Sequence, residues 1–160
     1  MKKSLLLFFI SIVLAFCTGC EKRDYLGFEE GYVIGSYVCY ISDSDGVAIT
    51  SSPQRCYCIS LNNNSKSVYH RMDYYTFNFP DSLFDFSENI LNALYDPENC
   101  GPVFFGDEDI SSFKIRFKYE IVEEKNKTRF SSIGACVSQG AAFPWNEYDQ
   151  IKITDIFKSN

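Results

Sequence analysis

The side chains that could carry out chemistry are few: one histidine, His70, one tryptophan, Trp145, and seven cysteines among 160 residues. A nucleophilic relay of the Ser-His-Asp or Cys-His kind would have to use His70 as its base. No Gly-x-Ser-x-Gly motif accompanies this histidine. The sequence therefore predicts a structural or surface histidine, no catalytic residue and no enzyme.

Acidic clusters at Asp107 to Asp109 and at Glu123 with Glu124 are what a hydrolase acting through surface carboxylates would use. Glycosidase carboxylates come from separate elements, however, and these clusters fit solvated turns. The run from Asp43 to Gly46 resembles the opening of a calcium loop but lacks the further acidic ligands. It is interpreted as a hairpin turn, and the hydrolase remains an alternative function.

The N-terminus has the layout of an export signal, with Lys2 and Lys3 before an apolar run from Leu5 to Phe16. This run has about a dozen apolar residues, fewer than the roughly 20 that cross a bilayer. The sequence Cys17-Thr18-Gly19-Cys20 resembles a lipobox, although the first position usually carries an aliphatic residue. Residues 1–19 are therefore predicted to be a signal peptide, and Cys20 is predicted to carry lipid, including palmitate, as a membrane anchor.

Export makes disulfides plausible among the remaining cysteines. The predicted domain has five cysteines, which can form at most two disulfides and leave one free thiol. The sequence does not rank the possible pairings. Cys56 and Cys58 lie two apart on an expected strand, about 6.5–7 Å from each other, and should seek different partners. These two thiols are also the alternative soft-metal site, with His70 nearby, but no metal and no cofactor is expected. The candidate disulfide residues are Cys39, Cys56, Cys58, Cys100 and Cys136.

Aromatic residues make up 17% of the chain, which is enough to fill a core and to leave a contact surface. Tyrosine and tryptophan tolerate partial exposure better than phenylalanine. The candidate ligand contacts are therefore Tyr74, Tyr75, Trp145 and Tyr148.

The elements that must position these residues are mostly strands. Residues 113–121 alternate apolar and charged side chains without a break, which predicts Phe113, Ile115, Phe117, Tyr119 and Ile121 in a core. Further strands are expected at 32–41, 54–61, 74–79, 129–137 and 150–157, and the turn at 124–127 should join two of them as a hairpin.

One short helix is expected from an N-cap at Ser87 to Tyr95, ending before Pro97. Strands followed by a helix and more strands predict an all-β fold. The two alternatives are a small Greek-key barrel of the OB type, capped by a helix after its third strand, and a two-sheet β-sandwich.

Removing the signal leaves 141 residues, enough for one domain at 31–160 behind a lipidated cysteine and tether at 20–30. The 13 basic and 21 acidic side chains left give a formal charge of −8. Nucleic acid is therefore not an expected partner, because its affinity comes mainly from Lys and Arg.

Three segments, Gly31 to Gly35, Phe77 to Phe86 and Asn99 to Phe105, resemble small Bacteroidota lipoproteins of unknown function. The charged residues after Cys20 resemble the segment that directs such lipoproteins to the outer membrane or cell surface. The resemblance implies location and compactness, and no activity. The expected function is a membrane-anchored, non-catalytic binding or accessory module for an unknown protein or glycan.

Overall fold

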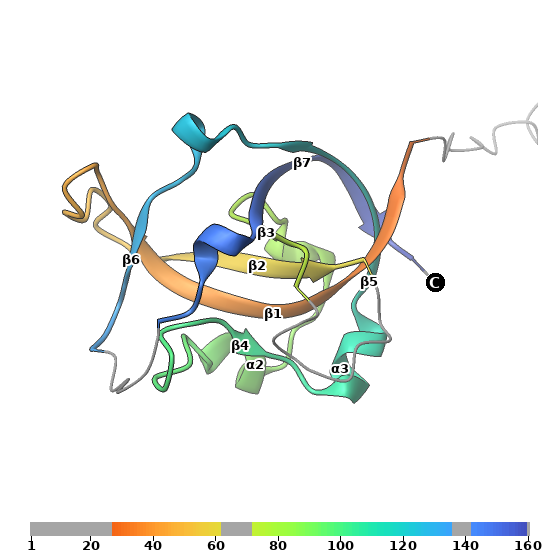
Figure 1. The fold of residues 1–160 in the computed structure, drawn as a ribbon. Helices are drawn as coiled ribbons and strands as arrows, with labels where there is room; N and C mark the ends of the chain where they lie inside the picture. Colours follow the sequence, from red (N-terminus) through yellow and green to blue (C-terminus); the bar gives the residue numbers. More distant parts are fainter. Residues whose placement is uncertain (1–26, 62–71, 136–141, 160) are drawn as a thin grey trace, which may run out of the picture.

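The structure is a computed structural model that describes residues 27–61, 72–135 and 142–159. The described residues form one mixed sheet of seven strands with two short α-helices (Figure 1). The strands are β1 (Glu29–Ile41), β2 (Gln54–Ser60), β3 (Tyr74–Thr76), β4 (Val103–Phe104), β5 (Lys114–Ile121), β6 (Phe130–Ser132) and β7 (Asp149–Lys158). The helices are α2 (Glu88–Asn92) and α3 (Asp107–Ser112), and short 3-10 turns lie at Asp81–Leu83, Glu124–Asn126 and Trp145–Glu147.

The strand pairings form a circuit. β1 pairs with β2, β2 with β3, β3 in parallel with β7, β7 with β5, and β5 again with β1. β5 pairs only with the first residues of β1. Farther along β1, β4 pairs with Gly35 and Ser36, and β6 pairs with residues 39–41. This connectivity is that of a partly open OB-type barrel with its helices after the third strand. The two-sheet alternative is not found, because all seven strands belong to one sheet.

The expected β-barrel is not a closed one in this structure. The seam between β3 and β7 holds only two residue pairs, Tyr74 with Asp149 and Tyr75 with Gln150. Beyond these two pairs, the side-chain amide of Asn78 makes the hydrogen bonds to β7 that the backbone of a longer β3 would make. Its Nδ2 donates to the carbonyl of Ile153 at 2.8 Å, and the Ile153 amide donates to its Oδ1 at 3.0 Å.

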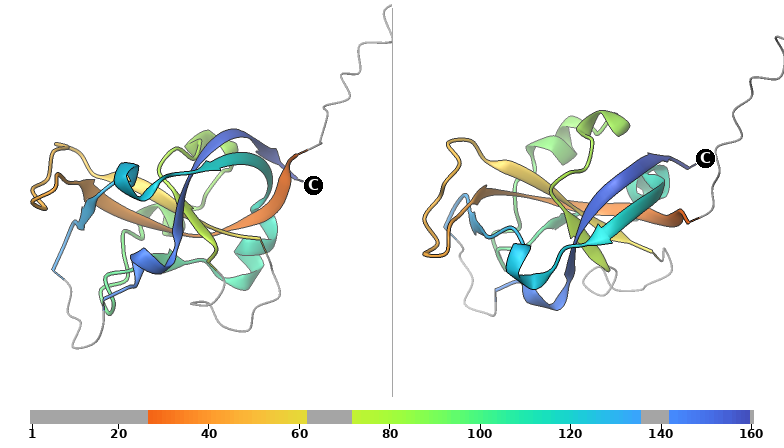
Figure 2. Two further views of the ribbon diagram at one scale, coloured as in Figure 1. Left: turned by 45° about the horizontal axis from the view of Figure 1, so that its top comes forward. Right: turned by 90° about the horizontal axis from the view of Figure 1, so that it is seen from above.

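The curvature of β1 allows it to pair with four other strands. Its pairing with β2 shifts register between Val33 and Gly35, and such a bulge bends a strand. Glycine is required beside this bend, since a Cβ on Gly35 would lie 2.7 Å from the carbonyl oxygen of Val103. Figure 2 shows β1 running the length of the domain in both further views.

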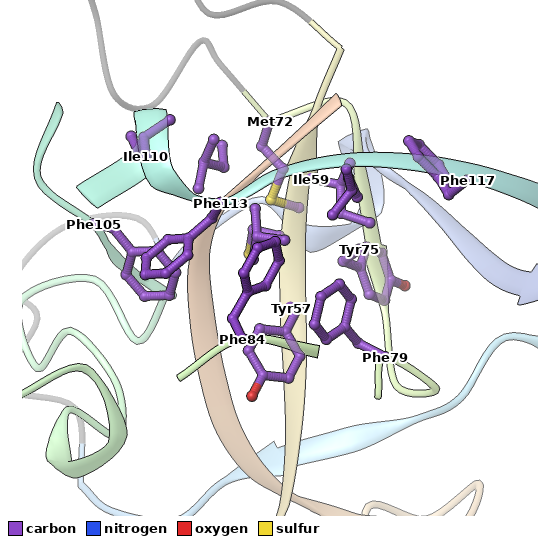
Figure 3. Packing of buried hydrophobic residues seen from close by; sticks show 14 of the residues in the cluster. Tyr57, Ile59, Met72, Tyr75, Phe79, Phe84, Phe105, Ile110, Phe113 and Phe117 are labelled. Carbon is purple, nitrogen blue, oxygen red and sulfur yellow. The ribbon is translucent and has the colours of Figure 1, made fainter. Parts of the chain in front are cut away.

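The main core lies between the curled sheet and the segment from Phe79 to Phe113 (Figure 3). Tyr57 of β2 is 1% exposed, and its ring centroid lies 4.6 Å from that of Phe79 and 5.4 Å from that of Phe86. Phe86 in turn packs on Phe113 at 4.8 Å. Such close aromatic pairs contribute beyond simple area burial, so the phenylalanines of this segment hold the helices against the sheet.

The predicted core face of β5 is confirmed only in its first half. Phe113, Ile115 and Phe117 are buried, Tyr119 is half-buried, and Ile121 is 57% exposed. The expectation for Ile121 was wrong because β5 runs past the edge of the core.

Two other predictions of local structure need correction. The acidic cluster Asp107 to Asp109, expected in a solvated turn, forms the first turn of α3, in which Ile110 is buried. The turn at 124–127 does not close a hairpin, because β5 pairs with β7 and β1 whereas β6 pairs with β1. The expected helix is confirmed with Ser87 at its N-cap, but it ends at Asn92.

Candidate functional site: a cavity beside the start of β1

A surface cavity of about 520 Å³ lies between the start of β1, the C-terminal half of β5 and the middle of β7. We call it the β5 cavity, because four of its seven lining residues belong to that strand. Its volume falls within the range of about 300–1,000 Å³ that is usual for ligand sites. It is lined by Gly27, Glu29, Lys118, Tyr119, Glu120, Ile121 and Thr154.

A chain of hydroxyl groups fixes one wall of the β5 cavity. The hydroxyl oxygens of Tyr74 and Tyr119 lie 2.8 Å apart, and Tyr119 donates to Oε1 of Glu29 at 3.2 Å. The two rings pack with their centroids 4.9 Å apart. Desolvation, followed by the hydrogen bond to Tyr74, raises the pKa of Tyr119 well above its ordinary value. Tyr119 is therefore a neutral donor at physiological pH, suited to binding and unsuited to acting as a base.

A β-bulge shapes the opposite wall. Lys118 pairs with Asp155 and Tyr119 with Ile153, so Thr154 has no residue opposite it in β5. Bulges redirect a side chain and often occur beside functional sites. Ile121 adds an apolar surface, since it is among the most exposed large hydrophobic residues in the described chain.

The structure places the four aromatic candidates in two regions. Tyr74 supports the β5 cavity through Tyr119. Tyr75 is 3% exposed, and burial raises its pKa to about 12. Trp145 is half-buried, with its ring centroid 5.3 Å from that of Tyr75, and Tyr148 stacks on Phe143 at 5.6 Å. Tyr75, Trp145 and Tyr148 therefore contribute mainly to the packing of the hydrophobic core.

The chain matches no family model, no curated protein and no solved structure. The resemblance to small Bacteroidota lipoproteins therefore stays a prediction. Sequence reasoning did not single out the lining of the β5 cavity as a site, because the lining comes from three strands that are distant in sequence. Tyr74, which it did single out, does not line the cavity but contacts Tyr119.

The cysteines separate into two groups. Cys39, Cys56 and Cys58 are free, fully buried thiols, so the prediction that they form disulfides is wrong for this structure. No two of the described cysteines are bonded to each other. Cys100 is in the disulfide-bonded state, and Cys136, like Cys20 and His70, lies outside the described residues.

Burial also argues against a soft-metal site at Cys56 and Cys58. Desolvation raises the pKa of both thiols far above the ordinary value, whereas a metal binds the thiolate. No group of three His, Cys, Asp or Glu residues within the described ranges is arranged to hold a metal ion.

The acidic clusters lie on the surface, as expected for solvated segments. Asp107 to Asp109 occupy the first turn of α3 and are exposed. Glu123 and Glu124 form ion pairs with Lys125 at 2.9 Å and Lys127 at 2.8 Å. Asp43 closes the β1–β2 turn, where its Oδ1 accepts the amides of Asp45 and Val47.

Thiol labelling should distinguish these groups of cysteines. Burial raises the pKa of Cys39 to about 12. At pH 8, Cys39, Cys56 and Cys58 should therefore label slowly in the native protein and rapidly in urea.

Because the folded state favours the protonated thiols, their contribution to stability should be complete below about pH 9 and fall as the pH rises above it. Rapid labelling of these three thiols in the native protein would contradict their assignment as buried thiols.

Proposed function

We propose that the chain is a lipid-anchored envelope protein of the outer membrane or cell surface, which binds a protein or glycan partner without catalysing a reaction. The observation that carries the proposal is the Cys17-Thr18-Gly19-Cys20 sequence behind an apolar run too short to span a bilayer. None of the described helices has the length and apolarity needed to cross a membrane.

The arrangement of the described domain supports a tethered binding module. β1 begins at Glu29, so only eight residues separate Cys20 from the first strand. A charged segment this short serves as a tether. The β1–β2 hairpin lies at the opposite end of the domain from the start of β1 (Figures 1 and 2). Anchored through Cys20, the domain would present this hairpin, with Val47 and Ile49 exposed, away from the lipid.

A non-catalytic role is favoured by the character of the side chains. The β5 cavity is lined by Tyr119 and by carboxylates, without an imidazole or a thiol among its described lining residues. A hydrolase acting through surface carboxylates remains the alternative. Hydrolysis of envelope glycans by the purified chain would establish that alternative.

The variant Cys20→Ser should lose all lipid labelling and leave the membrane fraction, because its thiol is the proposed attachment point. Labelled palmitate and membrane fractionation of the expressed full chain measure the two effects separately. Cys17→Ser is the matched control, since it removes the neighbouring thiol and should leave labelling intact. Retention of unlabelled Cys20→Ser in the membrane pellet would contradict the anchoring proposal.

A further inference from the structure

A second cavity, of about 340 Å³, lies along the start of β7. We call it the β7 cavity. Residues 150–152 of β7 form its floor, the segment after β3 forms one wall, and the segment between β5 and β6 forms the other. Its volume is within the range that is usual for ligand sites. It is lined by Phe77, Asn78, Val122, Asn126, Thr128, Gln150, Ile151 and Lys152.

The polar groups of the β7 cavity lie on one face of the sheet. Gln150 and Lys152 are two residues apart on β7, so their side chains share a face and start about 6.5–7 Å from each other. Thr128 is held over Gln150 by two hydrogen bonds. Its amide donates to Oε1 of Gln150 at 2.7 Å, and its hydroxyl oxygen accepts Nε2 at 2.9 Å. Thr128 and Lys152 are therefore close enough to contact one small ligand.

Phe77 reaches the same face from the β3 side. Tyr75 pairs with Gln150 in parallel register, and neighbours in register point to the same face. Phe77 follows two residues later with its ring centroid 6.3 Å from that of Tyr75, so it keeps that face. The hydrogen bonds from Asn78 to Ile153 hold this segment beside β7. Phe77 is half-buried, and part of its side chain lines the cavity.

Two of the lining side chains are already satisfied, and three others are not. The amides of Gln150 and Asn78 use both their donor and acceptor atoms within the domain. The Asn126 amide and the Lys152 ammonium, by contrast, have no side-chain hydrogen bond or ion pair with a described residue. The Thr128 hydroxyl accepts a bond from Gln150 and keeps its own proton. These three groups are available to a ligand.

Apolar side chains flank the three polar groups. Phe77 lines the β3 side of the cavity, and Val122 lines the β5 side. The amide of Val122 donates to the carbonyl of Gln150 at 2.9 Å, which fixes that wall against β7. A pyranose ring matches this arrangement, because it has apolar C–H faces and a rim of hydroxyl groups. A purely apolar ligand would leave the polar groups without hydrogen bonds.

The charge of the lining selects among sugars. Among the described residues that line the β7 cavity, Lys152 alone is charged. Glu120 lies opposite Lys152 in register, but it does not line the cavity and forms no ion pair with this lysine. A ring carboxylate would give the ammonium of Lys152 a charge-assisted hydrogen bond.

We infer that the β7 cavity binds a hexuronic acid residue of a glycan, with the ring between Phe77 and Val122 and the carboxylate on Lys152. The inference rests on the proposed binding function and deepens it, because it names the class of glycan and the site. It depends neither on the lipid anchor nor on the β5 cavity.

The test titrates the unlipidated full chain, Cys20→Ser, with methyl β-glucuronide and follows amide chemical shifts. Saturable shifts should centre on Thr128 and Lys152, with a dissociation constant on the order of 1 mM, as expected for one sugar unit. Methyl β-glucoside has a hydroxymethyl group in place of the carboxylate and should bind about fivefold more weakly. Acetate lacks the ring and should bind about tenfold more weakly or worse.

Exposed variants locate the site without disturbing the core. Lys152→Gln should bind the glucuronide and the glucoside alike, because only the carboxylate contact is lost. Asn126→Ala should weaken both sugars by about threefold to fivefold. Lys125→Gln is the matched control and should change neither affinity. Lys125 belongs to the same wall segment, but it is paired with Glu123 at 2.9 Å and lies outside the lining.

Three results would overturn the inference: no saturable shift with the glucuronide, selectivity that persists in Lys152→Gln, or selectivity that is lost in Lys125→Gln. Acetate that binds as tightly as the glucuronide would overturn the sugar assignment and indicate a simple anion site. Every arm uses the unlipidated variant, so these failures are distinct from a failure of lipid labelling at Cys20. A chain that bound a protein partner and no uronide would keep the proposed function and lose this inference.

Discussion

Phe117→Ala should lower the free energy of unfolding by about 3–5 kcal/mol, the cost of removing a buried phenyl ring and leaving a cavity. Phe117 is fully buried, and its ring centroid lies 5.3 Å from that of Tyr119. A Cβ on Gly31 would lie 3.1 Å from this ring, so β1 passes directly over it. β5 pairs with β1 on one edge and β7 on the other. The strand therefore has little freedom to move into the space.

Urea unfolding of the unlipidated chain measures the loss, and Glu120→Ala is the control on the same strand. Glu120 is exposed, and surface substitutions usually change stability by about 0.5 kcal/mol or less. Equal losses for the two variants would mean that β5 is not oriented as described, and the barrel built on it would have to be withdrawn.

Arg55→Met should cost about 2–4 kcal/mol, because it removes several charge-assisted hydrogen bonds from a half-buried site. Arg55 donates to the hydroxyl of Ser36 at 2.6 Å and to the carbonyls of Leu91 at 2.6 Å and Ala93 at 3.2 Å. It thereby ties β2 to the end of α2. Ser36 is fully buried and would lose this partner.

Arg129→Met is the matched control, since Arg129 is exposed and donates to one carbonyl, that of Ser44, at 3.2 Å. This variant should stay within about 0.5 kcal/mol of the parent in the same urea unfolding experiment. A cost below about 1 kcal/mol for Arg55→Met would show that solvent replaces its hydrogen bonds, and that the link between β2 and α2 contributes little.

The strands could be predicted because their patterns are local. Alternation in 113–121 and the β-branched and aromatic runs around Tyr37, Tyr57 and Ile153 follow from side chains that point to opposite faces. The pattern failed at Ile121 because alternation gives the face of a residue and does not give the point at which the core ends. It also missed α3, where Ile110 is the one buried side chain in a polar segment.

The sequence by itself determined the strand content and the helix start at Ser87, whereas the export signal and the lipidation of Cys20 stay predictions. Each of these depends on neighbouring residues. The tertiary structure alone decided that β5 pairs with β7 rather than β6, and that Cys39, Cys56 and Cys58 stay reduced in a dry interior. It also brought Glu29, Tyr119 and Thr154 into one cavity. Those outcomes depend on how strands distant in sequence align, which is fixed by burial and register across the whole sheet.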